Sequence, residues 1–96
     1  MILHLRSVLD IAQILGGKEH TVSLSEGATV CGLIDLLATK HGGPLREQIL
    51  QSSEPMELIP QVKIYVNGRG IDFLEGLDTV LQDGDDIVIM PQISGG

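Results

Sequence analysis

The last twelve residues, 85–96, constrain the fold of this chain more than any other stretch. They begin with two acidic residues, continue as a short apolar run, Ile87–Met90, and then reach Pro91. Val and Ile favour β-strands, and proline ends a strand's hydrogen-bond ladder because it lacks a backbone N–H. The sequence therefore predicts a strand followed by a short arm that ends in two glycines.

The two terminal glycines, Gly95 and Gly96, suggest a role for the arm outside the folded core. Glycine brings no side chain to bury and loses much conformational freedom on ordering. A frayed end, or a chance pair in a chain with 12 glycines among 96 residues, is the alternative. We expect a folded domain over residues 1–90 and a flexible C-terminal Gly-Gly arm over residues 91–96.

Composition limits the classes of partner and site. A chain of 96 residues forms one domain, and its net charge of −7 disfavours nucleic acid and anionic membrane surfaces as partners. The single Cys31 cannot form an internal disulfide, and no stretch resembles a signal peptide or a membrane span, so we expect a cytoplasmic protein. We interpret Cys31 as a small, partly buried residue, with a reactive thiol as the alternative.

Hydrophobic periodicity predicts the elements between the two ends. Apolar residues at helical spacing predict a short helix over Val8–Leu15 and a main helix that Thr29 caps and Gly42 ends. Pro44 favours a further short helix that extends to Leu50. Strands are expected at Ile2–Leu5, Lys18–Ser25, Val62–Val66 and Arg69–Phe73, with a tight turn at Asn67-Gly68 and a loop over Gln51–Gln61 that contains two prolines.

Period-2 alternation divides the last strand into two faces. Ile87 and Ile89 should face the core, whereas Val88 and Met90 should face the other way. We predict that Val88, Met90 and Ile93 form a docking patch for partner proteins, because methionine adapts to more than one surface. The alternative is that the chain itself covers Val88 and Met90.

This order of strands and helices predicts an α+β domain of two layers. It also resembles the ubiquitin-like sulfur carriers of the MoaD/ThiS group, which includes the small subunit of molybdopterin synthase. The pieces that carry the resemblance are Thr29-Val30, Val66-Asn67-Gly68, Leu77–Leu81 before Asp83-Gly84-Asp85, and Pro91 with Ser94-Gly95-Gly96. The resemblance implies a β-grasp fold with a mixed sheet of four to five strands crossed by one main helix.

The resemblance also implies that the protein is a substrate rather than an enzyme. An adenylyltransferase related to the ubiquitin-activating enzymes would use MgATP to adenylate Gly96, and sulfur would then replace AMP as a thiocarboxylate. No bound cofactor is expected. A sulfur-accepting synthase subunit, such as the large subunit of molybdopterin synthase, would receive the sulfur for molybdopterin or a tungsten pterin. The expected partner-binding and tail residues are Val88, Met90, Pro91, Gln92, Ile93, Ser94 and Gly95.

Three alternatives remain at this stage. The sulfur could go to thiamin, to tRNA thiolation or to cysteine synthesis. The chain could instead be conjugated to lysines as a protein modifier, or be a β-grasp interaction domain whose glycines are idle. An enzyme of its own is not indicated, because no nucleophile with a neighbouring His, no paired carboxylate and base, and no metal-binding spacing stands out.

Overall fold

The computed structural model describes residues 1–91, and the predictions for Gln92, Ile93, Ser94, Gly95 and Gly96 lie outside that range. The strands are β1 (Ile2–Ser7), β2 (Glu19–Ser23), β3 (Leu50–Ser53), β4 (Met56–Leu58), β5 (Lys63–Val66), β6 (Arg69–Gly70) and β7 (Asp86–Met90). The helices are α1 (Leu9–Leu15), α2 (Val30–His41) and α3 (Gly43–Ile49), with 3₁₀ turns η1 (Ile71–Phe73) and η2 (Gly76–Asp78).

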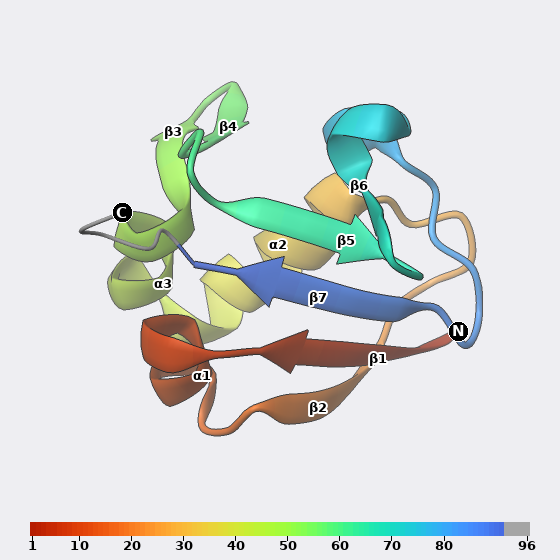
Figure 1. Cartoon of the computed structure of the whole chain (residues 1–96), viewed down its shortest axis with the longest axis horizontal. Coiled ribbons are helices and arrows are strands. Elements are labelled where there is room, and N and C mark those ends of the chain that lie inside the picture. The colour runs from red at the N-terminus through yellow and green to blue at the C-terminus, as the bar shows by residue number, and fades with distance from the viewer. Residues whose placement is uncertain (92–96) are drawn as a thin grey trace.

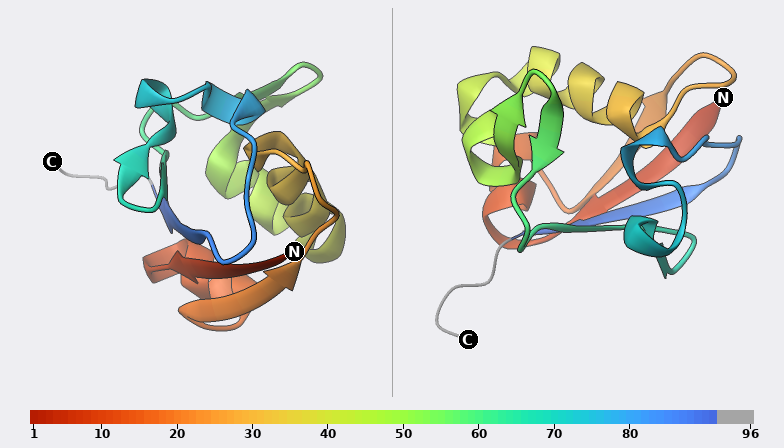
Figure 2. Two further views of the ribbon diagram at one scale, coloured as in Figure 1. Left: turned by 90° about the vertical axis from the view of Figure 1, so that its right-hand side faces the viewer. Right: turned by 90° about the horizontal axis from the view of Figure 1, so that it is seen from above.

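The last strand, β7, lies in the middle of the main sheet (Figure 1). Within residues 1–91 this sheet has five strands in the order β2-β1-β7-β5-β6. β7 runs parallel to β1 and antiparallel to β5. A parallel pair cannot be joined by a tight turn, and the main helix lies in the long connection between these two strands. The helices cover one face of the sheet (Figure 2), which confirms the predicted α+β arrangement of a mixed sheet crossed by one main helix.

The two faces of β7 differ as the alternation predicts. Ile87 and Ile89 are completely buried, whereas Val88 and Met90 are half-buried on the opposite face. We call the face that carries Val88 and Met90 the outer face of the sheet. The aliphatic core between the sheet and the helices includes Leu3, Leu5, Ile11, Val30, Leu33, Ile34, Leu37, Leu45, Ile49, Ile64, Ile87 and Ile89.

The main helix has the predicted boundaries and caps. Thr29 is extended, and its side chain accepts a hydrogen bond from the backbone N–H of Gly32 at 3.2 Å. This bond satisfies one of the N–H groups that a helix leaves unpaired at its start. The helix ends at Gly42, whose φ of 72° suits a residue without a side chain.

The turn at Asn67-Gly68 joins β5 to β6 and is tied to the start of β7. Asn67 and Gly68 have φ values of 53° and 83°, as a tight hairpin turn requires. The Asn67 side chain donates to Asp85 Oδ1 at 2.9 Å and accepts from the backbone N–H of Asp86 at 2.9 Å. The other oxygen of Asp85 accepts from the backbone N–H of Gln82 at 2.8 Å. The acidic turn before β7 therefore has a structural role.

The prediction of a loop over Gln51–Gln61 is wrong. The stretch forms a second, two-stranded sheet from β3 and β4, drawn in green in Figure 1. The prolines do not prevent this, because Pro55 lies in the turn and Pro60 follows β4. At neither position does the residue have to donate a backbone hydrogen bond to a neighbouring strand. The hairpin is anchored to the core, since the N–H of Ile59 donates to the carbonyl of Ile49 at 2.8 Å.

The predicted return strand over Arg69–Phe73 is correct only for its first two residues. Gly70 pairs with Tyr65 and Arg69 with Val66, and the chain then turns into η1. Ile71 is buried, so the chain bends inward at this point instead of continuing along the edge of β5. In the part of the chain that the structure describes, no helix has the length and apolar character needed to cross a bilayer.

Candidate functional site

The arm predicted to carry the chemistry starts at a well-anchored point. β7 is paired on both sides, and Pro91, the last described residue, is buried directly after it. A strand held on both sides cannot shift in register without disturbing two ladders. The position of Pro91 is therefore fixed relative to the sheet. Their predicted roles, and the predicted boundary between the domain and a flexible arm, remain predictions.

The two docking residues that the structure describes lie side by side on the outer face. Val88 is opposite Arg6 of β1 and Tyr65 of β5, and Met90 is opposite Lys63 of β5. Both Val88 and Met90 are half-buried, so their own sheet neighbours cover them in part and leave the rest accessible. The structure thus brings Val88, Met90 and Pro91 together beside the start of the arm.

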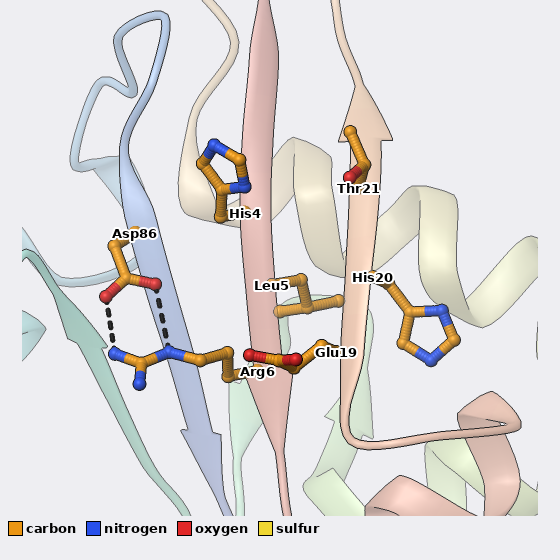
Figure 3. Close-up of a pocket in the computed structure, with 7 residues that line it drawn as sticks. All are labelled: His4, Leu5, Arg6, Glu19, His20, Thr21 and Asp86. Atoms are coloured by element: carbon orange, nitrogen blue, oxygen red, sulfur yellow. Dashed lines mark hydrogen bonds and ion pairs between the residues drawn. The ribbon is translucent and has the colours of Figure 1, made fainter.

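Arg6 and Asp86 form an ion pair across the outer face (Figure 3). Arg6 Nε donates to Asp86 Oδ1 at 3.1 Å, and Arg6 Nη2 donates to Asp86 Oδ2 at 2.5 Å. The hydrogen bond with Asp86, followed by the charge of Asp86, raises the pKa of Arg6, so the guanidinium stays protonated. The side chains are 51% and 39% exposed, and such a surface pair orients groups more than it stabilises the fold.

An open, polar depression of about 530 Å³ lies beside this pair, over β1 and β2 (Figure 3). Its lining residues are His4, Leu5, Arg6, Glu19, His20, Thr21 and Asp86. Among residues 1–91, no three His, Cys, Asp or Glu side chains converge as metal ligands would.

Cys31 lies in the first turn of α2, on the helical side of the domain. It is half-buried, and its Sγ lies 3.7 Å from Met56 Sδ of the hairpin. This environment agrees with the interpretation of Cys31 as a small, partly buried residue. It lies away from the outer face, in the layer that packs behind the sheet.

Sequence reasoning missed the neighbours of the docking residues. Alternation shows which side chains of β7 share a face, but the identities of Arg6, Lys63 and Tyr65 as neighbours depend on which strands pair with it. The signal available was that Lys63 and Tyr65 alternate with the buried residues of their own strand. That pattern places them on a polar face without indicating which strand they border.

The sequence pattern of the ThiS family matches residues 9–96 of the chain. Two similar proteins are described as sulfur carriers. One, from Archaeoglobus fulgidus and provisionally described, is 42% identical over 75% of this chain and 78% of its own length. The other, sulfur carrier protein CysO of Mycobacterium tuberculosis, is 36% identical over 83% of this chain and 84% of its own length. The small archaeal modifier protein 3 of Haloferax volcanii is 29% identical over the full length of both chains.

Solved structures agree with these matches. The HVO 2177 protein of Haloferax volcanii superposes with a TM-score of 0.83 at 28% identity, over 100% of this chain and 87% of its own. A Pyrococcus furiosus protein, provisionally described as molybdopterin converting factor subunit 1, gives 0.75 at 25% identity, over 97% of this chain and 99% of its own. Urm1 of Trypanosoma brucei gives 0.79 at 18% identity over 99% of this chain and 95% of its own, a likeness of fold alone.

The fold, the matched family pattern and the relatives described as sulfur carriers all agree. The chain belongs to the ThiS/MoaD family of ubiquitin-like sulfur carriers, whose members are substrates of other enzymes rather than enzymes themselves.

Proposed function

We propose that the chain carries sulfur as a thiocarboxylate on Gly96 and delivers it to a pterin, in the synthesis of molybdopterin or a tungsten pterin. The observation that carries the proposal is the position of β7. This central strand is paired on both sides and ends at Met90, and buried Pro91, the first residue of the proposed arm, follows it directly. A carrier needs a rigid domain from which an extended arm can reach into another protein, and a central strand is a firm base for the proposed arm.

The chemistry requires two steps at the last carbonyl carbon. A Gly96 carboxylate oxygen attacks the α-phosphorus of MgATP, which forms an acyl adenylate and releases pyrophosphate. A sulfur nucleophile then attacks the acyl carbon and AMP leaves, so that one oxygen is replaced by sulfur. The activating enzyme binds ATP, and the carrier supplies only the acyl group. Because glycine has no side chain, the acyl carbon is unhindered, and the end of the chain is narrow enough to enter a confined channel in the activating enzyme.

The length of the arm suits a buried active site in another protein. Six residues, 91–96, span roughly 20 Å when extended at about 3.3 Å each. We propose that Val88 and Met90, with Pro91, Gln92 and Ile93, contact the partner while Ser94, Gly95 and Gly96 enter its channel. The half-buried state of Val88 and Met90 supports this, because part of each side chain is free to be covered.

The proposed partners are an adenylyltransferase related to the ubiquitin-activating enzymes and a sulfur-accepting synthase subunit. The likeness to a protein described as molybdopterin converting factor subunit 1 favours the large subunit of molybdopterin synthase as the acceptor. The chain would then be the non-catalytic small subunit of that synthase.

A second destination is favoured by the relatives named as sulfur carriers, among them CysO at 36% identity. On this proposal the same thiocarboxylate serves cysteine synthesis, thiamin or thiolated tRNA. The acyl chemistry at Gly96 is unchanged, and only the acceptor differs. The enzyme that co-purifies with the chain distinguishes the two destinations.

A third proposal, conjugation to lysines, is favoured by the similarity to a small archaeal modifier protein over the full length of both chains. Activated Gly96 would then be attacked by a lysine amine rather than by sulfur. A ladder of heavier conjugates in cell extract, lost when Gly96 is deleted, would support this proposal over transfer to a small molecule.

Mass spectrometry of the C-terminal peptide tests the carrier proposal. The mature protein should end at Gly96, and incubation with ATP, a sulfur donor and the co-purifying adenylyltransferase should replace one oxygen of that residue by sulfur. Deletion of Gly96 should abolish the exchange. Cys31→Ser should leave it intact, which separates a thiocarboxylate from a persulfide on the thiol. An unchanged C-terminal mass would refute the proposal, provided that the same enzyme preparation is shown to activate another carrier protein.

A further inference from the structure

The outer edge of β5 is only partly covered. In the described residues, β6 pairs with Tyr65 and Val66 alone, and the chain then leaves the edge at η1. Lys63 and Ile64, at the start of β5, therefore border the sheet on that side with no strand beside them. A strand edge without a neighbour presents backbone groups that can pair with another chain.

A mostly apolar pocket of about 310 Å³ lies at this uncovered edge. It is lined by Lys63 and Tyr65 from the outer face and by Val62 and Ile64 from the core face. The remaining lining residues are Leu58, Gly70, Ile71, Asp72 and Phe73. Because the lining comes from both faces of β5, the pocket extends around the edge itself.

Phe73, the chain's single phenylalanine, stands at the rim of this pocket and is 89% exposed. A side chain added at Gly70 would contact Phe73 Cδ2 at 3.6 Å and Tyr65 Cε1 at 3.7 Å. Both Tyr65 and Phe73 therefore lie next to Gly70. Aromatic residues are enriched at protein interfaces, and here an exposed one borders an apolar pocket.

The pocket lies beside the end of β7, after which the proposed arm begins. Lys63, which lines the pocket, is directly opposite Met90, and Pro91 follows. Tyr65 is directly opposite Val88, so the aromatic pair continues the surface of the proposed docking patch. An enzyme that contacts Met90 and Pro91 would therefore lie close to this edge.

The side chains along the opposite edge strand, β2, are more polar. On β2, Glu19, Thr21 and Ser23 are exposed and polar, and the depression beside that strand is polar as well. Polar and charged residues are a common means of protecting an edge strand from pairing. In the described residues, the edge of β5 therefore combines an uncovered stretch of strand with an apolar pocket whose lining includes both Tyr65 and Phe73.

We propose that an extended, apolar segment of the activating adenylyltransferase pairs with β5 at Lys63 and Ile64 and inserts an apolar side chain beneath Phe73. Main-chain hydrogen bonds would supply affinity and the pocket would supply selectivity, as in other cases of strand addition. This inference rests on the proposed function, because it assigns a second contact to the enzyme that activates Gly96.

The test compares Phe73→Ala and Gly70→Glu with the control Leu36→Ala. Gly70 has an ordinary negative φ of −62°, and a Cβ added there would meet Tyr65 and Phe73 at van der Waals distance. Glu at this position therefore adds a charge beside both rings without backbone strain. Leu36 is an apolar residue of α2 that is 39% exposed in the helical layer. Circular dichroism verifies that each variant is folded.

The measurement is ATP–pyrophosphate exchange by the co-purifying adenylyltransferase as a function of carrier concentration. We expect both pocket variants to raise KM about tenfold with kcat within about twofold, and Leu36→Ala to match wild type. We also expect the Ile64 amide to exchange more slowly with deuterium when the enzyme is bound. Exchange activity with an unchanged KM in both pocket variants overturns this inference alone. No exchange with the wild-type chain overturns the proposed function and this inference with it.

Discussion

Arg6 on β1 donates two hydrogen bonds to Asp86 at the start of β7, Nε to Oδ1 at 3.1 Å and Nη2 to Oδ2 at 2.5 Å. The pair joins the first and last strands of the chain, which run parallel at the centre of the sheet. It also orients Arg6, which lies opposite Val88 in the register and so forms one side of the proposed docking patch.

The raised pKa of Arg6 predicts how its contribution depends on pH. A cation whose folded pKa is raised contributes stability below its unfolded pKa and loses it only as pH rises through the folded value. The pKa of folded Arg6 is raised above the ordinary arginine value by its hydrogen bond with Asp86, so none of this stability is lost in the alkaline range where the domain can be studied. Thermal unfolding of wild type and Arg6→Ala should differ by the same small amount at about pH 7 and about pH 10. A difference that disappears by the higher pH would contradict this assignment.

The two faces of β7 should respond differently to truncation. Ile89→Ala removes a completely buried side chain from the central strand and should lower the free energy of unfolding by about 2–5 kcal/mol. Val88→Ala, one residue away on the half-buried outer face, should cost roughly 1 kcal/mol or less. Urea titration of both variants measures the difference. Equal losses would mean that the face assignment is incorrect.

The N-cap of the main helix should be worth about 1 kcal/mol. Thr29→Ala removes the acceptor for the N–H of Gly32 and should destabilise the domain by roughly 0.5–2 kcal/mol. Thr29→Ser retains a hydroxyl that can accept the same bond, so it should recover most of the loss. Chemical denaturation compares the three proteins, and a Ser variant as unstable as the Ala variant would show that the hydroxyl is not what matters.

Asn67 combines a positive φ of 53° with two side-chain hydrogen bonds to the start of β7. Asn67→Gly keeps the turn conformation and loses only the bonds, so it should cost about 1 kcal/mol. Asn67→Ala loses the bonds and also forces alanine into an unfavourable left-handed backbone conformation. We expect it to lower the free energy of unfolding by roughly 2 kcal/mol. Equilibrium unfolding of the pair separates the two effects, and an Ala variant as stable as the Gly variant would argue against backbone strain.

The docking patch on β7 should affect partner binding more than folding. Val88→Lys places a charge at the centre of the proposed contact and should raise KM for activation of the chain about tenfold. Thr21→Lys adds the same charge on the exposed edge strand β2 and should leave KM near wild type. Steady-state kinetics with the co-purifying adenylyltransferase measures both. Equal KM values for the two variants would show that charge in general, and not this patch, governs the encounter.

The sequence alone determined the elements whose signals are local. Alternation separated Ile87 and Ile89 from Val88 and Met90, the spacing of apolar residues defined the main helix, and Asn67-Gly68 defined the turn, because each pattern reflects the chain's own geometry. The arm over residues 91–96 stays a prediction, which rests on the absence of side chains at Gly95 and Gly96.

Tertiary structure decided everything that depends on which segments meet. The hairpin of β3 and β4 forms because its strands pair with each other and are anchored on the core at Ile49, although Pro55 and Pro60 suggested a loop. β6 stops after two residues because Ile71 turns into the core. The central place of β7, and the neighbours it therefore gives Val88, follow from long-range pairing with β1 and β5, and no local pattern encodes a partner so distant in the sequence.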